Sequence, residues 1–187
     1  MNANGLHFHD DLAAFAEGAL GGGLSPQVSA LIAQASQQRH EPQQTLALLA
    51  QARAAAPSHP APLIALYRFY FYGHQLAQAR AVGEDALAIA RTALGPNFGD
   101  MPPDAEATRS NAAVRFYLFT LKGLAYLNMR LDDMDEARLM LGELRRLDPH
   151  DHVGGALLFH VLTCHERGDT AEAPSAYPVR GWTATGP

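Results

Sequence analysis

The sequence predicts an all-α protein in which pairs of helices stack on one another as a solenoid. The first observation is a repeat distance of 34 residues: Thr45, Leu49 and Ala52 are followed, one repeat later, by Ala79, Gly83 and Ala86. A fixed period of this length is typical of helical arrays, whose units bury their apolar faces on their neighbours. The second observation is a length of 187 residues with 48% hydrophobic residues, which suits one domain or one short solenoid.

Composition excludes several classes of protein. The formal net charge of −5 argues against a dedicated nucleic-acid binder, which is usually basic. Cys164 is the only cysteine, so no intramolecular disulfide can form. The first residues lack a basic segment and a long apolar run, and no stretch approaches the roughly 20 apolar residues of a membrane span. We therefore expect a cytoplasmic protein that does not bind membranes.

The chain begins with a predicted amphipathic helix over residues 10–20. Its apolar stripe consists of Leu12, Phe15, Ala16 and Ala19, and three glycines at 21–23 end it. Residues 1–25 are thus an N-terminal helix and a glycine-rich linker. Ser25 and Pro26 then begin the repeat array as a helix cap and a first helical residue.

Three hairpins and a final helix make up the array, which we assign to residues 26–173. The predicted helix pairs are 26–38 with 43–55, 61–73 with 76–93, and 114–130 with 134–147, and a helix over 152–166 caps the stack. Ala79 and its equivalent Ala137 are 58 residues apart, 24 more than one period, and the excess is an insertion at about 94–113 with little helical pattern. Such insertions form loops that often carry function. Residues 174–187, with Trp182, are a tail.

The hairpins resemble tetratricopeptide repeats, which place small residues where two helices touch and a proline after the second helix. The third hairpin carries this pattern as Leu121, Leu124, Ala125, Ala137, Leu141, Leu144 and Pro149. Its run from Leu131 to Ala137 is the most family-like segment. The resemblance implies a right-handed solenoid of about three repeats, with an N-terminal helix and a C-terminal capping helix. The whole chain is also similar to short bacterial repeat proteins found near nitrogen-fixation genes.

The repeats depart from the tetratricopeptide pattern at three points. None of them contains the family's tryptophan. Tyr67 occupies a position that is usually small, so the second hairpin either splays apart or fills a gap with the tyrosine ring. The third repeat has two possible registers two residues apart, and we prefer the one without a longer turn.

Few residues suggest chemistry. His7, His9 and Asp10 have side chains that a metal could use, or they belong to a polar N-terminus. His160 and Cys164 share one face of a helix, which suits either two zinc ligands or a packed core pair. The sequence contains no phosphate-binding glycine loop and no nucleophile elbow. We therefore expect no enzyme activity, no metal and no cofactor.

The tetratricopeptide resemblance implies a binding groove, because the first helix of each hairpin lines the concave side of such arrays. Carried onto this chain, the partner-binding residues are Ile64, Arg68, Phe71, Tyr72, Phe119, Lys122, Tyr126 and Arg130. Cations beside aromatic rings fit a protein or peptide with both acidic and apolar groups. The expected function is non-catalytic protein–protein interaction, as an adaptor or assembly factor.

Two alternatives remain for the aromatic residues. The N-terminal helix or the 94–113 insertion can cover Phe71 and Tyr72 within the same chain. A second copy of the chain can also cover them, which would make the protein a homodimer, because large exposed apolar patches are rare on monomers.

Overall fold

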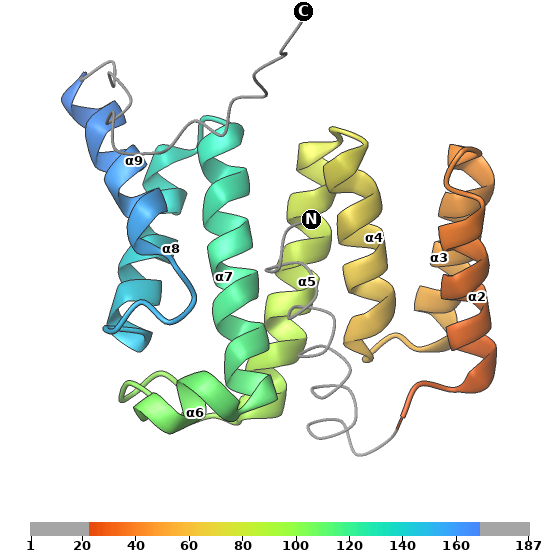
Figure 1. Ribbon diagram of the computed structural model, residues 1–187, viewed down its shortest axis with the longest axis horizontal. Helices are drawn as coiled ribbons and strands as arrows, with labels where there is room; N and C mark the ends of the chain where they lie inside the picture. Colours follow the sequence, from red (N-terminus) through yellow and green to blue (C-terminus); the bar gives the residue numbers. More distant parts are fainter. Residues whose placement is uncertain (1–22, 169–187) are drawn as a thin grey trace, which may run out of the picture.

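The computed structural model describes residues 23–168, and this part of the chain confirms the all-α prediction. Its helices, labelled in Figure 1, are α2 (Pro26–Gln37), α3 (Pro42–Ala55), α4 (Pro60–Tyr72), α5 (Leu76–Leu94), α6 (Ala105–Ser110), α7 (Ala112–Arg130), α8 (Met134–Leu147) and α9 (Ala156–Arg167). Within residues 23–168 the only β-type pairing is an isolated bridge between Phe98 and Met101. The predicted helix at 10–20 and the tail at 174–187 lie outside the described residues.

Side-chain caps and prolines fix where several helices begin. Ser25 accepts a hydrogen bond from the Val28 amide at the start of α2, and Asn111 accepts from two amides at the start of α7. α2, α3 and α4 each have proline in the first turn, where the missing N–H costs nothing. His74 and Asp132, both with positive φ, reverse the chain after α4 and α7.

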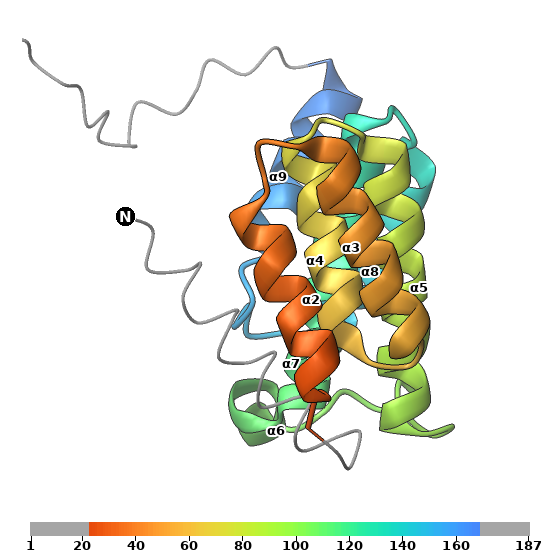
Figure 2. The ribbon, with the colours of Figure 1, turned by 90° about the vertical axis from the view of Figure 1, so that its right-hand side faces the viewer.

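Consecutive helices pack in pairs, and the pairs follow one another in a row. α2 contacts α3, α4 contacts α5 and α7 contacts α8, while α3–α4 and α5–α7 contacts join neighbouring pairs. Figure 1 shows the row from α2 and α3 at one end to α8 and α9 at the other. Figure 2 looks along it from the α2–α3 end, with these two helices side by side in front.

The core follows the repeat that the sequence shows. The second helix of each pair buries the residues at i, i+4 and i+7, and α5 and α8 each bury one more, Ala90 and Leu147. The repeated residues are Thr45, Leu49 and Ala52 in α3, Ala79, Gly83 and Ala86 in α5, and Ala137, Leu141 and Leu144 in α8. The longest stretch of core lies on α7, which contacts α5, α6, α8 and α9. Leu118, Leu124 and Leu127 on this helix are fully buried.

Three segments differ from the predictions. The 94–113 insertion contains the short helix α6, which lies at the N-terminal end of α7 (Figure 1). The Phe98 ring of this insertion meets the Tyr117 ring of α7 at 5.0 Å between centroids. α9 begins at Ala156 rather than near residue 152, because a loop held by two aspartates precedes it. The alternative of a packed core pair at His160 and Cys164 is wrong, since His160 is exposed and Cys164 is only half-buried on α9.

Candidate functional site

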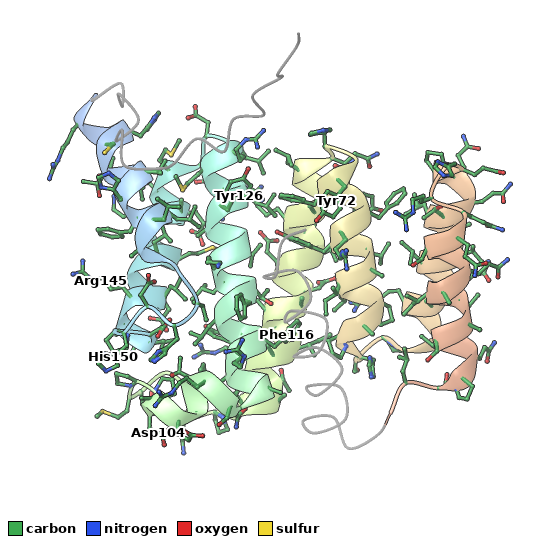
Figure 3. All side chains as sticks on the ribbon, in the orientation of Figure 1. Tyr72, Asp104, Phe116, Tyr126, Arg145 and His150 are labelled. Atoms are coloured by element: carbon green, nitrogen blue, oxygen red, sulfur yellow. The ribbon has the colours of Figure 1, made fainter. Side chains whose placement is uncertain are left out.

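An aromatic cluster joins α4 to α7 at the C-terminal ends of both helices. Phe71 is its centre, with ring centroids 5.8 Å from Tyr67, 5.5 Å from Tyr72 and 6.0 Å from Tyr126. Figure 3 shows Tyr72 on α4 and Tyr126 on α7 at the same end of the molecule. We call these four residues the aromatic face. Tyr72 is 71% exposed although its ring packs on Phe71, so the face carries a large aromatic surface in contact with water.

Tyr67 anchors the aromatic face because Gly123 makes room for its side chain. A Cβ atom on Gly123 of α7 would lie 3.0 Å from the Tyr67 hydroxyl, and the ring also lies against α5, 3.6 Å from where a Cβ atom on Gly83 would stand. The ring therefore fills the space between α4 and two other helices, one of the two outcomes that the sequence left open. Burial raises the pKa of Tyr67 to about 12, with smaller contributions from Tyr126 and Tyr72.

One cation, Arg130, contacts the aromatic face. Arg130 donates a hydrogen bond to the Tyr126 hydroxyl at 2.8 Å, and its guanidinium carbon lies 5.8 Å from the centre of the ring. Arg68 is half-buried, one turn before Tyr72 on α4. Besides Arg68 and Arg130, the sequences of α4 and α7 contain two more cationic residues, Arg115 and Lys122, and they contain no aspartate or glutamate. An acidic ligand therefore meets no like charge from these two helices.

A second aromatic–cation group lies on α7, closer to its N-terminal end. The Phe119 ring has the Arg115 guanidinium 5.3 Å from its centre on one side and the Lys122 ammonium at 5.1 Å. Sequence reasoning missed Arg115, although its spacing of four residues from Phe119 was a usable signal. Arg115 also donates a hydrogen bond to the Arg109 carbonyl at 3.3 Å, which ties it to α6.

Two predicted groove residues have mainly structural roles. Ile64 is only 8% exposed and packs in the core next to Leu63. Lys122 donates a hydrogen bond to the Val153 carbonyl, which ties α7 to the loop before α9. Burial lowers the pKa of Lys122, and Asp151 partly opposes this shift. Reversing the charge at Lys122 would therefore disturb this loop as well as any ligand, which makes Arg130 the better position for testing binding.

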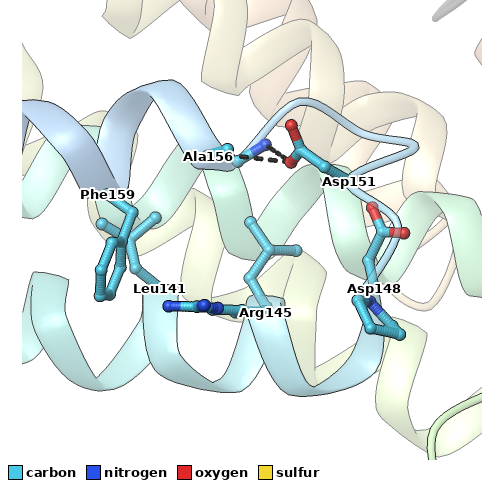
Figure 4. Close-up of a pocket in the computed structure, with 9 residues that line it drawn as sticks. Leu141, Arg145, Asp148, Asp151, Ala156 and Phe159 are labelled. Carbon is cyan, nitrogen blue, oxygen red and sulfur yellow. Dashed lines mark hydrogen bonds between the residues drawn. The ribbon is translucent and has the colours of Figure 1, made fainter.

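A cavity of about 360 Å³ lies between α8 and α9 and is the second candidate (Figure 4). The Arg145 guanidinium stands 5.4 Å from the centre of the Phe159 ring at its rim. The two carboxylates that line the cavity, those of Asp148 and Asp151, already have hydrogen-bond partners. Asp151 accepts from the Gly155 and Ala156 amides at the start of α9, and Asp148 accepts from the Val153 amide and pairs with His152. These contacts hold the loop, so we assign the carboxylates a structural role.

The described part of the chain contains no group of three or more metal-ligating side chains. His160 Nε2 and Cys164 Sγ are 3.6 Å apart on α9, and among the described residues they belong to no larger group of metal-ligating side chains. His7 and His9 lie outside the described residues. None of the helices between residues 23 and 168 combines the length and apolarity needed to cross a membrane.

The fold and the face together define an all-helical protein of stacked helix pairs with an exposed aromatic–cationic surface. No family model matches the chain, and no solved structure matches it. The chain is 33% identical over 122 residues to the "Uncharacterized 19.8 kDa protein in nifW 5'region" of Azotobacter chroococcum mcd 1. The alignment covers 63% of this chain and 68% of that protein, and the chain belongs to the same family.

Proposed function

We propose that this chain is a non-catalytic, tetratricopeptide-like interaction protein of the bacterial cytoplasm, an adaptor or assembly factor. Its partner is a peptide or helix with acidic and apolar groups that binds the aromatic face. The observation that supports this most is Tyr72, a large side chain that is 71% exposed. Its ring packs on Phe71, and the Phe71 ring in turn meets Tyr126. Rigid aromatic side chains of this kind dominate the energetics of protein interfaces.

Charge supports an acidic partner. Arg130 lies at the edge of the aromatic face, and neither α4 nor α7 contributes a carboxylate. A partner carboxylate beside Arg130 would gain a charge-assisted hydrogen bond, while its apolar groups would cover Tyr72. The order of the helix pairs, each contacting the next, supports the solenoid arrangement proposed here.

The test is affinity capture with the purified chain, followed by identification of the bound proteins. The relative lies in a nifW 5' region, so we would use lysates of a nitrogen-fixing bacterium grown with and without fixed nitrogen. We compare the wild type with Tyr72→Ala/Arg130→Glu. The matched control is Leu139→Ala/Arg167→Glu, which changes an exposed apolar residue on α8 and an exposed cation on α9.

Loss of a large ring at the centre of an interface costs about 2 kcal/mol or more of binding free energy, so we expect the Tyr72→Ala/Arg130→Glu variant to bind its partner at least roughly 30-fold more weakly. The control variant should retain the same partner. A partner that binds all three proteins equally would show that the aromatic face is not the binding surface. Sedimentation of the purified chain tests the homodimer alternative, which predicts a dimer that Tyr72→Ala dissociates.

A further inference from the structure

The cavity between α8 and α9 carries opposite charges at its two ends. Figure 4 shows the Arg145 guanidinium beside Leu141 and Phe159 at one end, and the carboxylates of Asp148 and Asp151 at the other. A cavity with this layout favours a ligand that carries both signs of charge, because each end attracts the opposite group. The aromatic face lies on α4 and α7, so this cavity is a separate site.

Arg145 is the cation available to such a ligand. The other two arginines of α8, Arg138 and Arg146, both pair with carboxylates. In residues 23–168 Arg145 forms no ion pair, and its guanidinium lies over the Phe159 ring instead. A guanidinium binds a carboxylate through two parallel hydrogen bonds in its own plane, and a ring on its face leaves that edge open. A ligand carboxylate therefore has a place at this end.

Asp151 holds the loop before α9 and still keeps an oxygen for a ligand. Its Oδ1 accepts hydrogen bonds from the Gly155 and Ala156 amides, and no hydrogen bond among the described residues uses its Oδ2. Amides are neutral donors, so the negative charge of the carboxylate remains. Lys122 of α7, whose pKa is lowered by burial and partly restored by Asp151, offsets some of this charge but does not line the cavity. A ligand ammonium group is therefore attracted to this end.

The space between the two ends is apolar and small. Leu141 and Leu144 of α8, both almost fully buried, line it together with Ala156 and Phe159 of α9. Its volume of about 360 Å³ is at the lower end of the range for ligand sites, about 300–1,000 Å³. Methylene groups gain free energy by leaving water for such a lining, whereas a peptide group would lose its hydrogen bonds. The cavity therefore fits a short methylene chain.

We propose that this cavity binds a small ω-amino acid, a molecule whose ammonium and carboxylate groups stand at the two ends of a short methylene chain. The carboxylate binds Arg145, the methylene chain lies on Leu141 and Leu144, and the ammonium group faces Asp151. The inference adds a small-molecule site to a protein that is proposed to bind a macromolecular partner elsewhere, and it does not depend on that proposed function.

The probe is 6-aminohexanoate, titrated into the isotope-labelled full-length chain while NMR follows the amide resonances of Gly155 and Ala156. A ligand of this size should bind with a dissociation constant on the order of 1 mM. Hexanoate and hexylamine each lack one of the charges and should bind at least roughly 10-fold more weakly.

Two variants remove one charge each from the protein. Arg145→Gln, and Asp151→Asn, which keeps an oxygen for the loop amides, should each weaken binding of 6-aminohexanoate at least roughly 10-fold. The matched control is Arg167→Gln, which removes an exposed cation of α9 that does not line the cavity and should leave binding unchanged. The same NMR spectra show that each variant is folded, and Arg145 is exposed, so its replacement leaves the core intact.

Any of three results would overturn the inference. The first is that 6-aminohexanoate at about 20 mM, well above the expected dissociation constant, shifts no resonance of the cavity residues. The second is that hexanoate or hexylamine binds as tightly as 6-aminohexanoate, because one of the two charges would then be irrelevant. The third is that Arg145→Gln or a folded Asp151→Asn binds the probe as tightly as the wild type.

Discussion

Gly83→Ala should destabilise the protein although alanine is the better helix former. Gly83 lies inside α5, where replacing glycine by alanine normally gains about 1 kcal/mol. A Cβ atom here would stand 2.8 Å from Leu124 Cδ2 and 3.3 Å from Leu124 Cγ. Carbon atoms pack best at about 3.5–4.0 Å, and Leu124 is fully buried on α7, so its side chain can shift only by displacing the closely packed atoms around it.

The net effect follows from two opposing terms. Overpacking of this kind costs about 1–3 kcal/mol, which exceeds the gain in helix propensity and leaves a net loss of about 1 kcal/mol. Gly142→Ala is the matched control, because Gly142 is an exposed glycine inside α8 with no atom within 4 Å of its added Cβ. Gly142→Ala should raise the free energy of unfolding by about 0.5–1 kcal/mol. The two variants therefore differ by roughly 2 kcal/mol, or about 4–8 °C in melting temperature for a chain of this size.

Urea and thermal unfolding followed by far-ultraviolet circular dichroism measure this difference. A second test adds Leu124→Ala, which removes the clashing atoms and should cost at least about 1 kcal/mol less in the Gly83→Ala background than in the wild type. Equal stabilisation by Gly83→Ala and Gly142→Ala would refute the close packing of α5 on α7 that positions the aromatic face.

Three further predictions concern polar groups. Because the pKa of Tyr67 is raised to about 12, its contribution to stability is complete below pH 10 and is lost, by about 3 kcal/mol, as the pH rises to 12. Ultraviolet titration of tyrosine ionisation should show a component near pH 12 that Tyr67→Phe removes, and persistence of this component in the variant would contradict its assignment to Tyr67. Burial lowers the pKa of His59 below 6.5, and His59 Nδ1 accepts a hydrogen bond from the Ala61 amide at 3.2 Å. The contribution of His59 to stability is therefore complete above pH 6.5 and is lost as the pH drops through the lowered pKa. His59→Asn keeps a capping oxygen and should make the free energy of unfolding, measured by urea unfolding at each pH, depend less on pH. An unchanged pH dependence in this variant would exclude His59 as the cause of the loss. Arg80→Met should lower the free energy of unfolding by about 1–3 kcal/mol, because Arg80 donates a hydrogen bond to the side-chain oxygen of the fully buried Asn128 at 3.1 Å. An unchanged urea midpoint in this variant would show that the hydrogen bond does not stabilise the fold.

Local patterns predicted the helix pairs well. The repeated residues of α3, α5 and α8 are buried because a helix brings residues four and seven apart onto one face, and that spacing is visible in the sequence. α6 was missed because six residues are too few to show a helical period. Its start depends on Asp104, whose carboxylate accepts from the Ala107 amide.

The candidate site was predicted only where it depends on one helix. The tetratricopeptide resemblance implied that Phe71 and Tyr72 on α4 line a groove, and in the structure Tyr72 is exposed and Phe71 is half-buried. Lys122 could not be placed in this way, since its partner Val153 lies 31 residues further on in a loop that no period describes. Ile64 is buried because its side chain meets the core that α5 and α7 complete. Contacts between distant segments are therefore the part that sequence reasoning could not supply.

The Tyr67 side chain makes one position on α4 and one on α7 depend on each other during evolution. A Cβ atom on Gly123 would lie 3.0 Å from the Tyr67 hydroxyl, so a larger residue at 123 requires a smaller one at 67. Substitutions at these two sites should therefore become established together rather than singly. An aligned set of related sequences would be expected to show tyrosine at position 67 paired with glycine at position 123. Sequences that lose the tyrosine would be free to vary at 123, whereas position 83 would stay small because of Leu124.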